Sequence, residues 1–167
     1  MPRRDNSVLP APMPVADLRK LLRYDRETGL LWWLVSTHGR RMHQPAGTAS
    51  GGYVSLMLNG RRYQAHRVIW FLENGDWIMV DHRNLDGIDN RWDNLRPATK
   101  QENGRNSRGY AKSGFKGVYP TPSGKWVARI KIGDRMVNFP SRVTAEEAYA
   151  DYCAAALEHH GAFARIT

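Results

Sequence analysis

The sequence predicts an α+β protein built from two modules. Short alternating apolar segments separated by turn residues predict antiparallel strands, and segments of helical periodicity lie between and after them. A polar, glycine-containing segment at residues 105–114, RNSRGYAKSG, has no apolar periodicity and predicts a linker. We therefore expect a flexible N-terminus at residues 1–14, a first domain at 15–108, a basic linker at 109–113 and a second domain at 114–167.

The first domain begins with a short helix predicted at residues 15–22, followed by a strand in GLLWWLV at 29–35. Next, Asn59-Gly60 separates two alternating runs, which is the strongest local pattern for a β-hairpin with a tight primed turn. The spacing of apolar residues in 66–74 then predicts a helix that ends at Gly75. The domain should thus contain β-hairpins N-terminal to residue 80.

The second domain is predicted to be a three-stranded antiparallel sheet packed on one helix. Turn residues divide FKGVYPTPSGKWVARIKIGDRMVNF into three strands, and the middle strand alternates between an apolar and a mostly cationic face. Its apolar face comprises Trp126, Ala128, Ile130 and Ile132, and its other face Lys125, Val127, Arg129 and Lys131. Thr144 and Glu147 predict a capping box that opens a helix ending at Gly161.

Composition favours a polyanionic partner. The 167 residues carry 25 Lys and Arg against 16 Asp and Glu, a formal charge of +9, and residues 98–142 hold ten basic and two acidic side chains. No apolar run is long enough for a membrane helix, and the leader lacks a signal-peptide apolar region. The single cysteine, Cys153, excludes an internal disulfide and a thiolate zinc knuckle. Nucleic acid is the expected partner, no membrane is involved, and the expected location is cytoplasmic.

Residues 80–106, VDHRNLDGIDNRWDNLRPATKQENGRN, carry the candidate chemistry. An apolar run ends at Asp81-His82, a polar loop and Asn94 follow, and a helical stretch beginning near Thr99 bears Asn103. Hydrolysis of a phosphodiester needs a base and a cation that neutralises developing charge. A histidine can accept a proton near neutral pH, and carboxylate and amide oxygens suit a hard cation. A strand, a loop, a second strand and a helix folded around one ion would meet both needs.

Other interpretations of nearby residues are open or weaker. Asp86 and Asp89 in DGIDN suggest a calcium loop, but the terminal Glu at the required spacing is missing, so we interpret them as residues that shape the loop. His66 opens the helix at 66–74, where it either contacts DNA or makes a structural hydrogen bond.

These residues resemble those of HNH endonucleases with the ββα-metal fold, especially phage and intron-encoded homing endonucleases. The resemblance rests on Asp81-His82, on Asn94 twelve residues after His82, and on Asn103 nine residues later, and it spans roughly residues 15–108. It implies that His82 is the general base, that Asp81 and Asn103 bind one divalent ion, and that Asn94 fixes the loop and histidine geometry. Because many members have histidine where this chain has Asn103, the implied ion is Mg²⁺ or Mn²⁺ rather than zinc.

The second half resembles the Apetala-two (ethylene-response-factor type) DNA-binding domain, which also occurs fused to phage HNH nucleases. GFKGVY, GKWVARI and TAEEAYADYCAAA are the matching segments. Members lay a three-stranded sheet in the major groove with the helix packed behind it. The resemblance implies that Lys116, Arg129, Lys131 and Arg135 face DNA. Arg105 and Arg108, just past Asn103, and Lys112 of the linker are expected to contact the DNA backbone.

The expected function is therefore that of a metal-dependent endonuclease that acts on double-stranded DNA as a monomer or dimer, in the host cytoplasm of a phage or a bacterium. Two alternatives stay open. One is a DNA-binding regulator whose nuclease fold has lost activity, and the other is a restriction or defence nuclease with the same catalytic fold.

Overall fold

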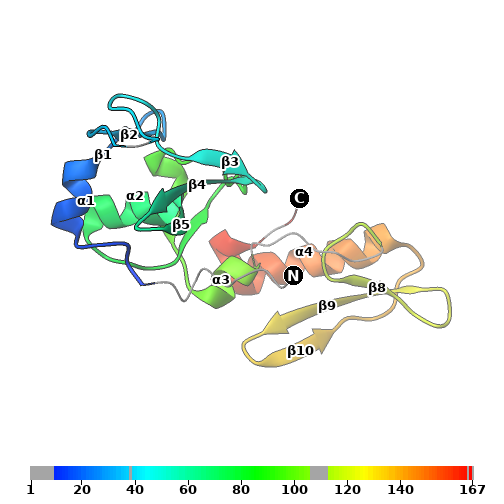
Figure 1. Ribbon diagram of the computed structural model, residues 1–167. Coiled ribbons are helices and arrows are strands. Elements are labelled where there is room, and N and C mark those ends of the chain that lie inside the picture. Colours follow the sequence, from blue (N-terminus) through cyan, green and yellow to red (C-terminus); the bar gives the residue numbers. More distant parts are fainter. Residues whose placement is uncertain (1–9, 38, 106–112, 165, 167) are drawn as a thin grey trace. The chain divides into compact units, whose positions relative to one another are not determined.

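The computed structural model describes residues 10–37, 39–105, 113–164 and 166, with the side chain of Arg105 left out. The chain forms two compact units, Met1–Thr99 and Lys100–Thr167 (Figure 1). The division falls just before a helix that the sequence interpretation assigned to the first domain. The expected linker at 109–113 lies, apart from Ser113, outside the described residues, and the domain limits stay predictions.

The first unit combines short helices with two small antiparallel sheets and a two-stranded ribbon. The helices α1 and α2 pack on strands that are at most six residues long. In chain order its elements are α1 (Val15–Leu21), β1 (Leu22–Tyr24), β2 (Leu31–Trp33), β3 (Thr48–Ser50), β4 (Tyr53–Leu58), β5 (Arg61–Gln64), α2 (Ala65–Asn74), β6 (Val80–His82), the 3-10 helix η2 (Trp92–Asn94) and β7 (Leu95–Pro97).

The predicted hairpin is confirmed. Strands β4 and β5 pair antiparallel across the two-residue turn, and β3 pairs with the other edge of β4. Asn59 and Gly60 have φ angles of 48° and 72°, the positive values that a type I′ turn needs at both central positions. Asparagine and glycine tolerate this conformation better than other residues, so the local sequence fixes the register of the pair.

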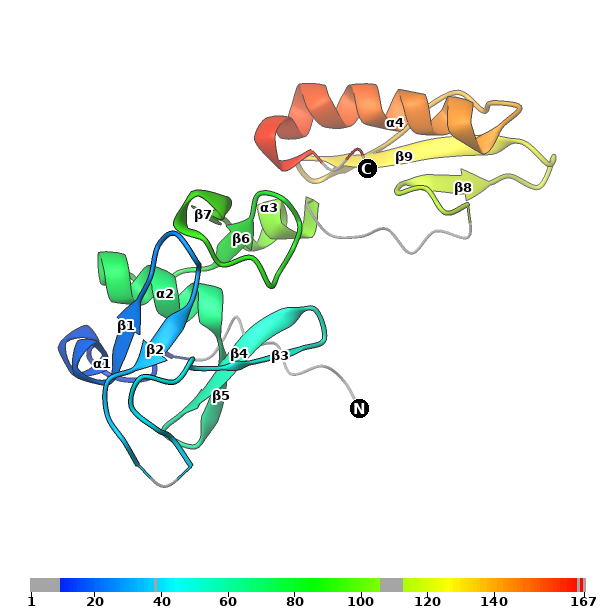
Figure 2. The same cartoon turned by 90° about the horizontal axis from the view of Figure 1, so that it is seen from above.

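Helix α2 is the centre of the first core. Val68 and Ile69 are fully buried, and Leu18 of α1 packs into the same cluster. The helix ends at Gly75, whose φ of 80° allows its N–H to donate to the carbonyl of Phe71, as the sequence predicted. Because α2 contacts both β4 and β6, it connects the hairpin sheet to the ribbon that bears Asp81 and His82 (Figure 2).

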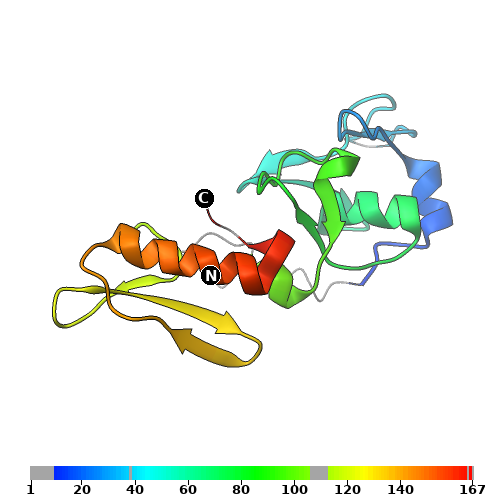
Figure 3. The ribbon, with the colours of Figure 1, turned by 180° about the vertical axis from the view of Figure 1, so that it is seen from behind.

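The second unit contains the predicted sheet and helix. Its elements are α3 (Lys100–Arg105), β8 (Val118–Pro120), β9 (Trp126–Ile132), β10 (Arg135–Asn138), α4 (Ala145–His160) and the 3-10 helix η3 (Gly161–Phe163). The strand order is β10-β9-β8, and α4 lies along one face of this sheet (Figures 2 and 3). The predicted facing is confirmed, because Ala128 and Ile130 are buried against the small residues Ala148 and Ala156 of α4.

Both ends of α4 follow the sequence prediction. The Thr144 hydroxyl accepts from the Glu147 N–H at 3.2 Å, and the Glu147 carboxylate accepts from the Thr144 N–H at 3.2 Å, which completes the capping box. Gly161 follows the last helical residue with a φ of 50°. Within the described residues, every helix is too short or too polar to cross a membrane.

Gly117 is expected to be intolerant of a side chain. It has a φ of +73°, and a Cβ atom there would lie 2.3 Å from the Tyr152 ring and 2.8 Å from the Arg129 carbonyl oxygen. We expect Gly117→Ala to lower the free energy of unfolding by about 2–4 kcal/mol, since it combines steric overlap with backbone strain. Gly114→Ala is the matched control: its φ is +79°, but nothing lies within 4 Å of the new Cβ. In urea denaturation, the free energies of unfolding of the two variants should differ by more than about 1 kcal/mol. Equal free energies would show that contact with Tyr152 and the Arg129 carbonyl is not the cause.

Candidate active site

Asp81 lies in the two-stranded ribbon of the first unit, directly opposite Arg96. Strands β6 and β7 pair antiparallel with Asp81 and Arg96 in register. Arg96 donates from Nε and Nη2 to the same carboxylate oxygen, Oδ2, at 3.0 and 2.7 Å. Both side chains are buried, with 7% and 8% of the surface of Arg96 and Asp81 exposed. The residue predicted to bind a metal therefore also forms a buried ion pair with Arg96, a residue that the sequence interpretation did not single out.

The neighbouring His82 is held by a different residue. Its Nε2 lies 3.0 Å from Oδ1 of Asn90, and both side chains are buried. Asn90 comes from the loop that connects β6 to η2, eight residues further along the chain. The sequence pattern predicts a polar loop here and indicates no role for Asn90. Its contact with His82 depends on how the loop folds back, which residue spacing does not reveal.

Asn94 connects the two ends of the same loop. Its Oδ1 accepts from the N–H of Asn84 at 2.9 Å, and its Nδ2 donates to the carbonyl of Asp89 at 2.6 Å. Its own carbonyl accepts from the N–H of Arg83 at 2.8 Å. These three bonds fix the backbone that follows His82. The catalytic role that the resemblance implied for Asn94 stays a prediction.

The acidic residues of the loop have structural partners. Asp86 accepts from the N–H of Ile88 at 3.0 Å, and Asp89 receives two bonds from the Arg91 guanidinium, at 2.8 and 2.7 Å. The hydrogen bonds from Arg91 lower the pKa of Asp89 to about 2, so this carboxylate stays ionised at neutral pH. The prediction that these acidic residues shape the loop is confirmed.

Two further rings surround His82. The centroid of His66, from the first turn of α2, lies 4.7 Å from that of His82 in an edge-to-face arrangement. Tyr53 of β4 lies 5.8 Å from His66 and 6.1 Å from His82. A Cβ on Gly87 would lie 2.5 Å from the Tyr53 ring, so the absence of a side chain there lets the loop close on the tyrosine. Residues from β4, α2, β6 and the loop thus converge on the candidate base.

His66 is buried without a hydrogen bond at one nitrogen. Only 4% of its surface is exposed, and Nδ1 has no hydrogen-bond partner. The structural hydrogen bond that the sequence interpretation considered is thus absent at this atom. Burial, with smaller contributions from His82 and Arg67, lowers the pKa of His66 well below its ordinary value. His66 is therefore neutral at pH 7.

This neutral histidine should make the first unit sensitive to acid. The unfolded chain binds a proton below pH ~6.5 whereas the folded chain does not, so stability falls as the pH drops, by at most about 1.4 kcal/mol per pH unit. His66→Phe keeps a ring but cannot bind the proton, and we expect it to reduce this loss between pH 7 and pH 5. Urea denaturation, followed by tryptophan fluorescence at each pH, measures this loss of stability. His43→Gln, which changes an exposed histidine, is the control. If the free energy of unfolding falls equally steeply with decreasing pH in His66→Phe and in the wild type, His66 is not the cause of the acid sensitivity.

The predicted metal ligands lie in different units. Asp81 is on β6 of the first unit, and Asn103 is on α3 of the second. Among the residues that the structure describes, no group of three or more His, Cys, Asp or Glu side chains is arranged to hold a metal ion. A carboxylate and an amide with water molecules fit Mg²⁺, which takes few protein ligands, better than zinc. The joint site of Asp81 and Asn103 stays a prediction.

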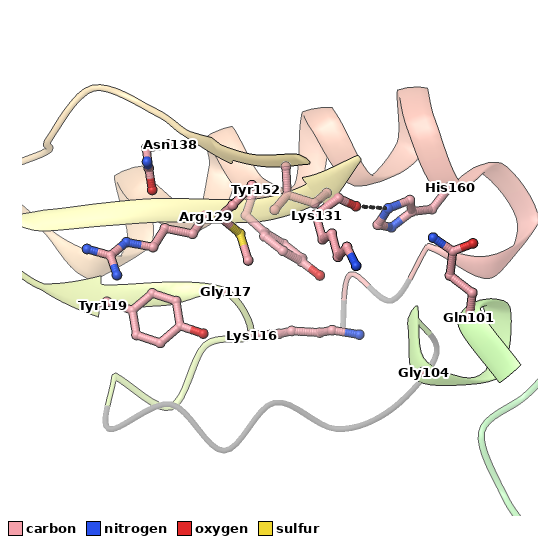
Figure 4. Close-up of a pocket in the computed structure, with 12 residues that line it drawn as sticks. Gln101, Gly104, Lys116, Gly117, Tyr119, Arg129, Lys131, Asn138, Tyr152 and His160 are labelled. Atoms are coloured by element: carbon pink, nitrogen blue, oxygen red, sulfur yellow. Dashed lines mark hydrogen bonds between the residues drawn. The ribbon is translucent and has the colours of Figure 1, made fainter. Parts of the chain in front are cut away.

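Some of the predicted DNA-contacting residues line a hollow of about 760 Å³ in the second unit (Figure 4). Lys116, Arg129 and Lys131 contribute to its wall, and the Arg129 guanidinium lies 5.2 Å from the centroid of the Tyr119 ring. Arg129 and Lys131 are exposed, whereas the alternate residues of the same strand, Ala128 and Ile130, face α4. Arg135, on β10, is exposed but is not among the lining residues. Arg108, Lys112 and the side chain of Arg105 lie outside the described part.

The segment around the site matches a known family. Residues 63–105 match a family model described as HNH endonuclease, which covers β6, the loop, β7 and α3. Neither a curated protein nor a solved structure matches the chain. The match supports a nuclease with DNA as its substrate, and it includes Asp81, His82, Asn94 and Asn103.

Proposed function

We propose that this protein is a metal-dependent DNA endonuclease of the HNH homing type. The observation that carries the proposal is that the segment matched by the HNH endonuclease model contains a buried Asp81-His82 pair on β6 and an asparagine, Asn94, that secures the loop behind it. This combination provides a proton acceptor next to a carboxylate that can bind a cation, and hydrolysis of a phosphodiester requires such a base and such a cation.

In the proposed reaction, His82 takes a proton from water, and the resulting hydroxide attacks the scissile phosphate in line. The bond from phosphorus to the 3′ oxygen breaks and the departing oxygen takes a proton from water, so that the products carry a 5′ phosphate and a 3′ hydroxyl. His82 then releases its proton to solvent. Asn94 keeps the loop after β6 in one conformation, so the imidazole is already oriented when DNA binds. One active site per chain favours a nick, and two chains meeting on DNA would cut both strands.

One Mg²⁺ or Mn²⁺ would be held by Asp81 and Asn103. The bound ion supplies charge neutralisation at the phosphate and at the departing 3′ oxygen. Asp81 shares its carboxylate with Arg96, so the protein alone should bind the ion weakly, with water and phosphate oxygens completing its coordination.

The second unit is proposed to hold the duplex through the exposed face of its sheet, as Apetala-two-like domains do. The basic side chains on that face support this role. We expect Arg129→Ala to weaken gel-shift binding several-fold and to reduce the slope of log affinity against log salt by about one, because one phosphate contact is lost. Lys20→Ala, an exposed change on α1 of the first unit that also removes one positive charge, is the control. An unchanged salt slope in Arg129→Ala would remove this residue from the DNA interface.

The nuclease proposal is tested with the wild-type chain and supercoiled plasmid. Nicking should occur with Mg²⁺ or Mn²⁺ and stop when EDTA is added. Sequencing of end-labelled products from a DNA library then gives the site and the number of strands cut. Binding without cleavage under all metal conditions would instead favour a DNA-binding regulator.

A further inference from the structure

We propose that Asn90 is a positioning residue that fixes the tautomer of His82, so that Nδ1 is the nitrogen that accepts the proton from water. The inference rests on the proposed function for its catalytic meaning, but the tautomer itself is a property of the folded protein. It begins from the contact of 3.0 Å between Nε2 of His82 and Oδ1 of Asn90.

The orientation of the Asn90 amide is fixed from its other end. Its Nδ2 donates to the backbone carbonyl of Ile88 at 3.2 Å. A carbonyl oxygen can only accept, so the NH₂ group must be the end that faces Ile88. If the amide were rotated by 180°, two oxygens would face each other at Ile88 in a partly buried position, which costs free energy. The oxygen of Asn90 is therefore the atom that faces His82.

This orientation decides where the proton of His82 lies. An amide oxygen cannot donate, so the short contact is a hydrogen bond only if Nε2 of His82 carries the hydrogen. A neutral imidazole has a hydrogen on one nitrogen and a lone pair on the other. In the neutral form of His82, the lone pair is consequently on Nδ1, and Nδ1 is the basic nitrogen.

The backbone of Asn90 is also held in place. Its carbonyl accepts from the Tyr24 hydroxyl at 2.7 Å, which connects the loop to β1. Burial raises the pKa of Tyr24, so its hydroxyl remains a donor over the whole neutral range. The adjacent residue Asp89 is bonded through its carbonyl to Asn94 and through its side chain to Arg91. Asn90 therefore lies in a part of the loop that is bonded to Tyr24, Arg91 and Asn94, where a side chain can act as a fixed hydrogen-bond acceptor.

The tautomer matters because a base must present its lone pair to the proton it removes. If Nε2 had the lone pair, it would point at Asn90, where water cannot enter without breaking the contact. With the hydrogen on Nε2, the protonated histidine formed in the reaction keeps its bond to Asn90, and this bond becomes charge-assisted and stronger. Asn90 thus orients His82 before the reaction and stabilises it afterwards, without touching DNA.

The direct test is a two-bond ¹H–¹⁵N correlation spectrum of the full chain labelled with ¹⁵N-histidine, recorded at about pH 8. The His82 signals are those that disappear in His82→Gln. We expect the pattern of an imidazole with hydrogen on Nε2. The pattern of an imidazole with hydrogen on Nδ1 would overturn the proposal, whether or not the protein cuts DNA.

Variants then separate positioning from folding. Asn90→Leu removes the acceptor and should give a mixture of tautomers and a fall in kcat of tenfold to about a hundredfold, with KM changed less. Asn90→Asp retains an oxygen that only accepts, so it should restore the Nε2–H pattern and part of kcat. Asn84→Ala alters the same loop without touching His82 and should leave the tautomer unchanged. A pure Nε2–H pattern in Asn90→Leu would contradict the role of Asn90.

The positioning role of Asn90 and the nuclease activity are distinguished by different measurements. A wild-type protein that shows the Nε2–H pattern but nicks no plasmid with any metal would overturn the nuclease proposal and leave the positioning role standing. A nuclease that cuts plasmid but shows hydrogen on Nδ1 would retain its function and lose this assignment.

Discussion

Replacement of His82 with alanine is expected to reduce metal-dependent plasmid nicking by about a thousandfold. A positioned acid–base group typically contributes a factor of 10²–10⁴ to the rate, and water without that base reacts slowly at neutral pH. DNA affinity should hardly change, because the basic side chains proposed to contact phosphates lie elsewhere in the chain. Initial nicking rates under excess enzyme, measured alongside gel shifts at fixed salt, give the two quantities separately.

The buried position of His82 requires controls for folding. His82→Gln retains a donor for the Asn90 oxygen and should be as inactive as the alanine variant, with smaller structural disturbance. His159→Ala changes a histidine at the end of α4 and should cut at the wild-type rate. If His82→Gln nicks plasmid at full rate, His82 is not the base and the mechanism is wrong.

Replacement of Arg96 with methionine is expected to lower the free energy of unfolding by about 3–5 kcal/mol. The variant leaves the Asp81 carboxylate buried without the guanidinium that faces it, and loss of one partner from a buried ion pair is strongly destabilising. Water cannot compensate for the missing Arg96 guanidinium, because only 8% of the Asp81 side chain is exposed to solvent. Urea denaturation at pH 7.5, followed by tryptophan fluorescence, measures the effect, since five of the six tryptophans lie in the first unit.

The double variant Asp81→Leu/Arg96→Met tests whether the unpaired Asp81 carboxylate causes the loss of stability. Removing both charges replaces the ion pair with apolar contacts and should recover most of the lost stability. The exposed pair of Lys20 and Asp17 provides a matched contrast, because its members are 74% and 54% exposed and Lys20→Met should cost less than about 1 kcal/mol. An Arg96→Met variant as stable as Lys20→Met would show that Asp81 does not depend on the guanidinium.

The ion pair also affects the metal proposal. The same carboxylate would serve Arg96 in the folded protein and a divalent ion in the reaction, and a guanidinium bonded to one oxygen reduces the charge available to the ion. Selective binding of metal in the presence of DNA follows from this, since phosphate oxygens would add the ligands that the protein lacks. Metal affinity should therefore be higher in the presence of a non-cleavable duplex than in its absence.

Elements with local sequence patterns were predictable from the residues alone. Asn59-Gly60 placed the β4–β5 turn because few other residues accept positive φ at both positions. Thr144 and Glu147 placed the start of α4, and the alternation in β9 predicted which residues face that helix. Asp81-His82 with Asn94 and Asn103 at fixed spacing also indicated the family that the segment 63–105 matches. In each case the decisive residues lie within a few positions of one another or form a recognisable spaced set.

The surroundings of these residues depend on contacts between segments that are distant in the chain. The pairing of Asp81 with Arg96 depends on the register of β6 and β7, and a shift of one residue would place a different side chain opposite the carboxylate. Asn90 reaches His82 because the loop folds back on itself, and His66 arrives from a helix that precedes β6. Hydrogen bonds and burial between distant segments depend on three-dimensional packing, and residue order along the chain does not encode those distances directly.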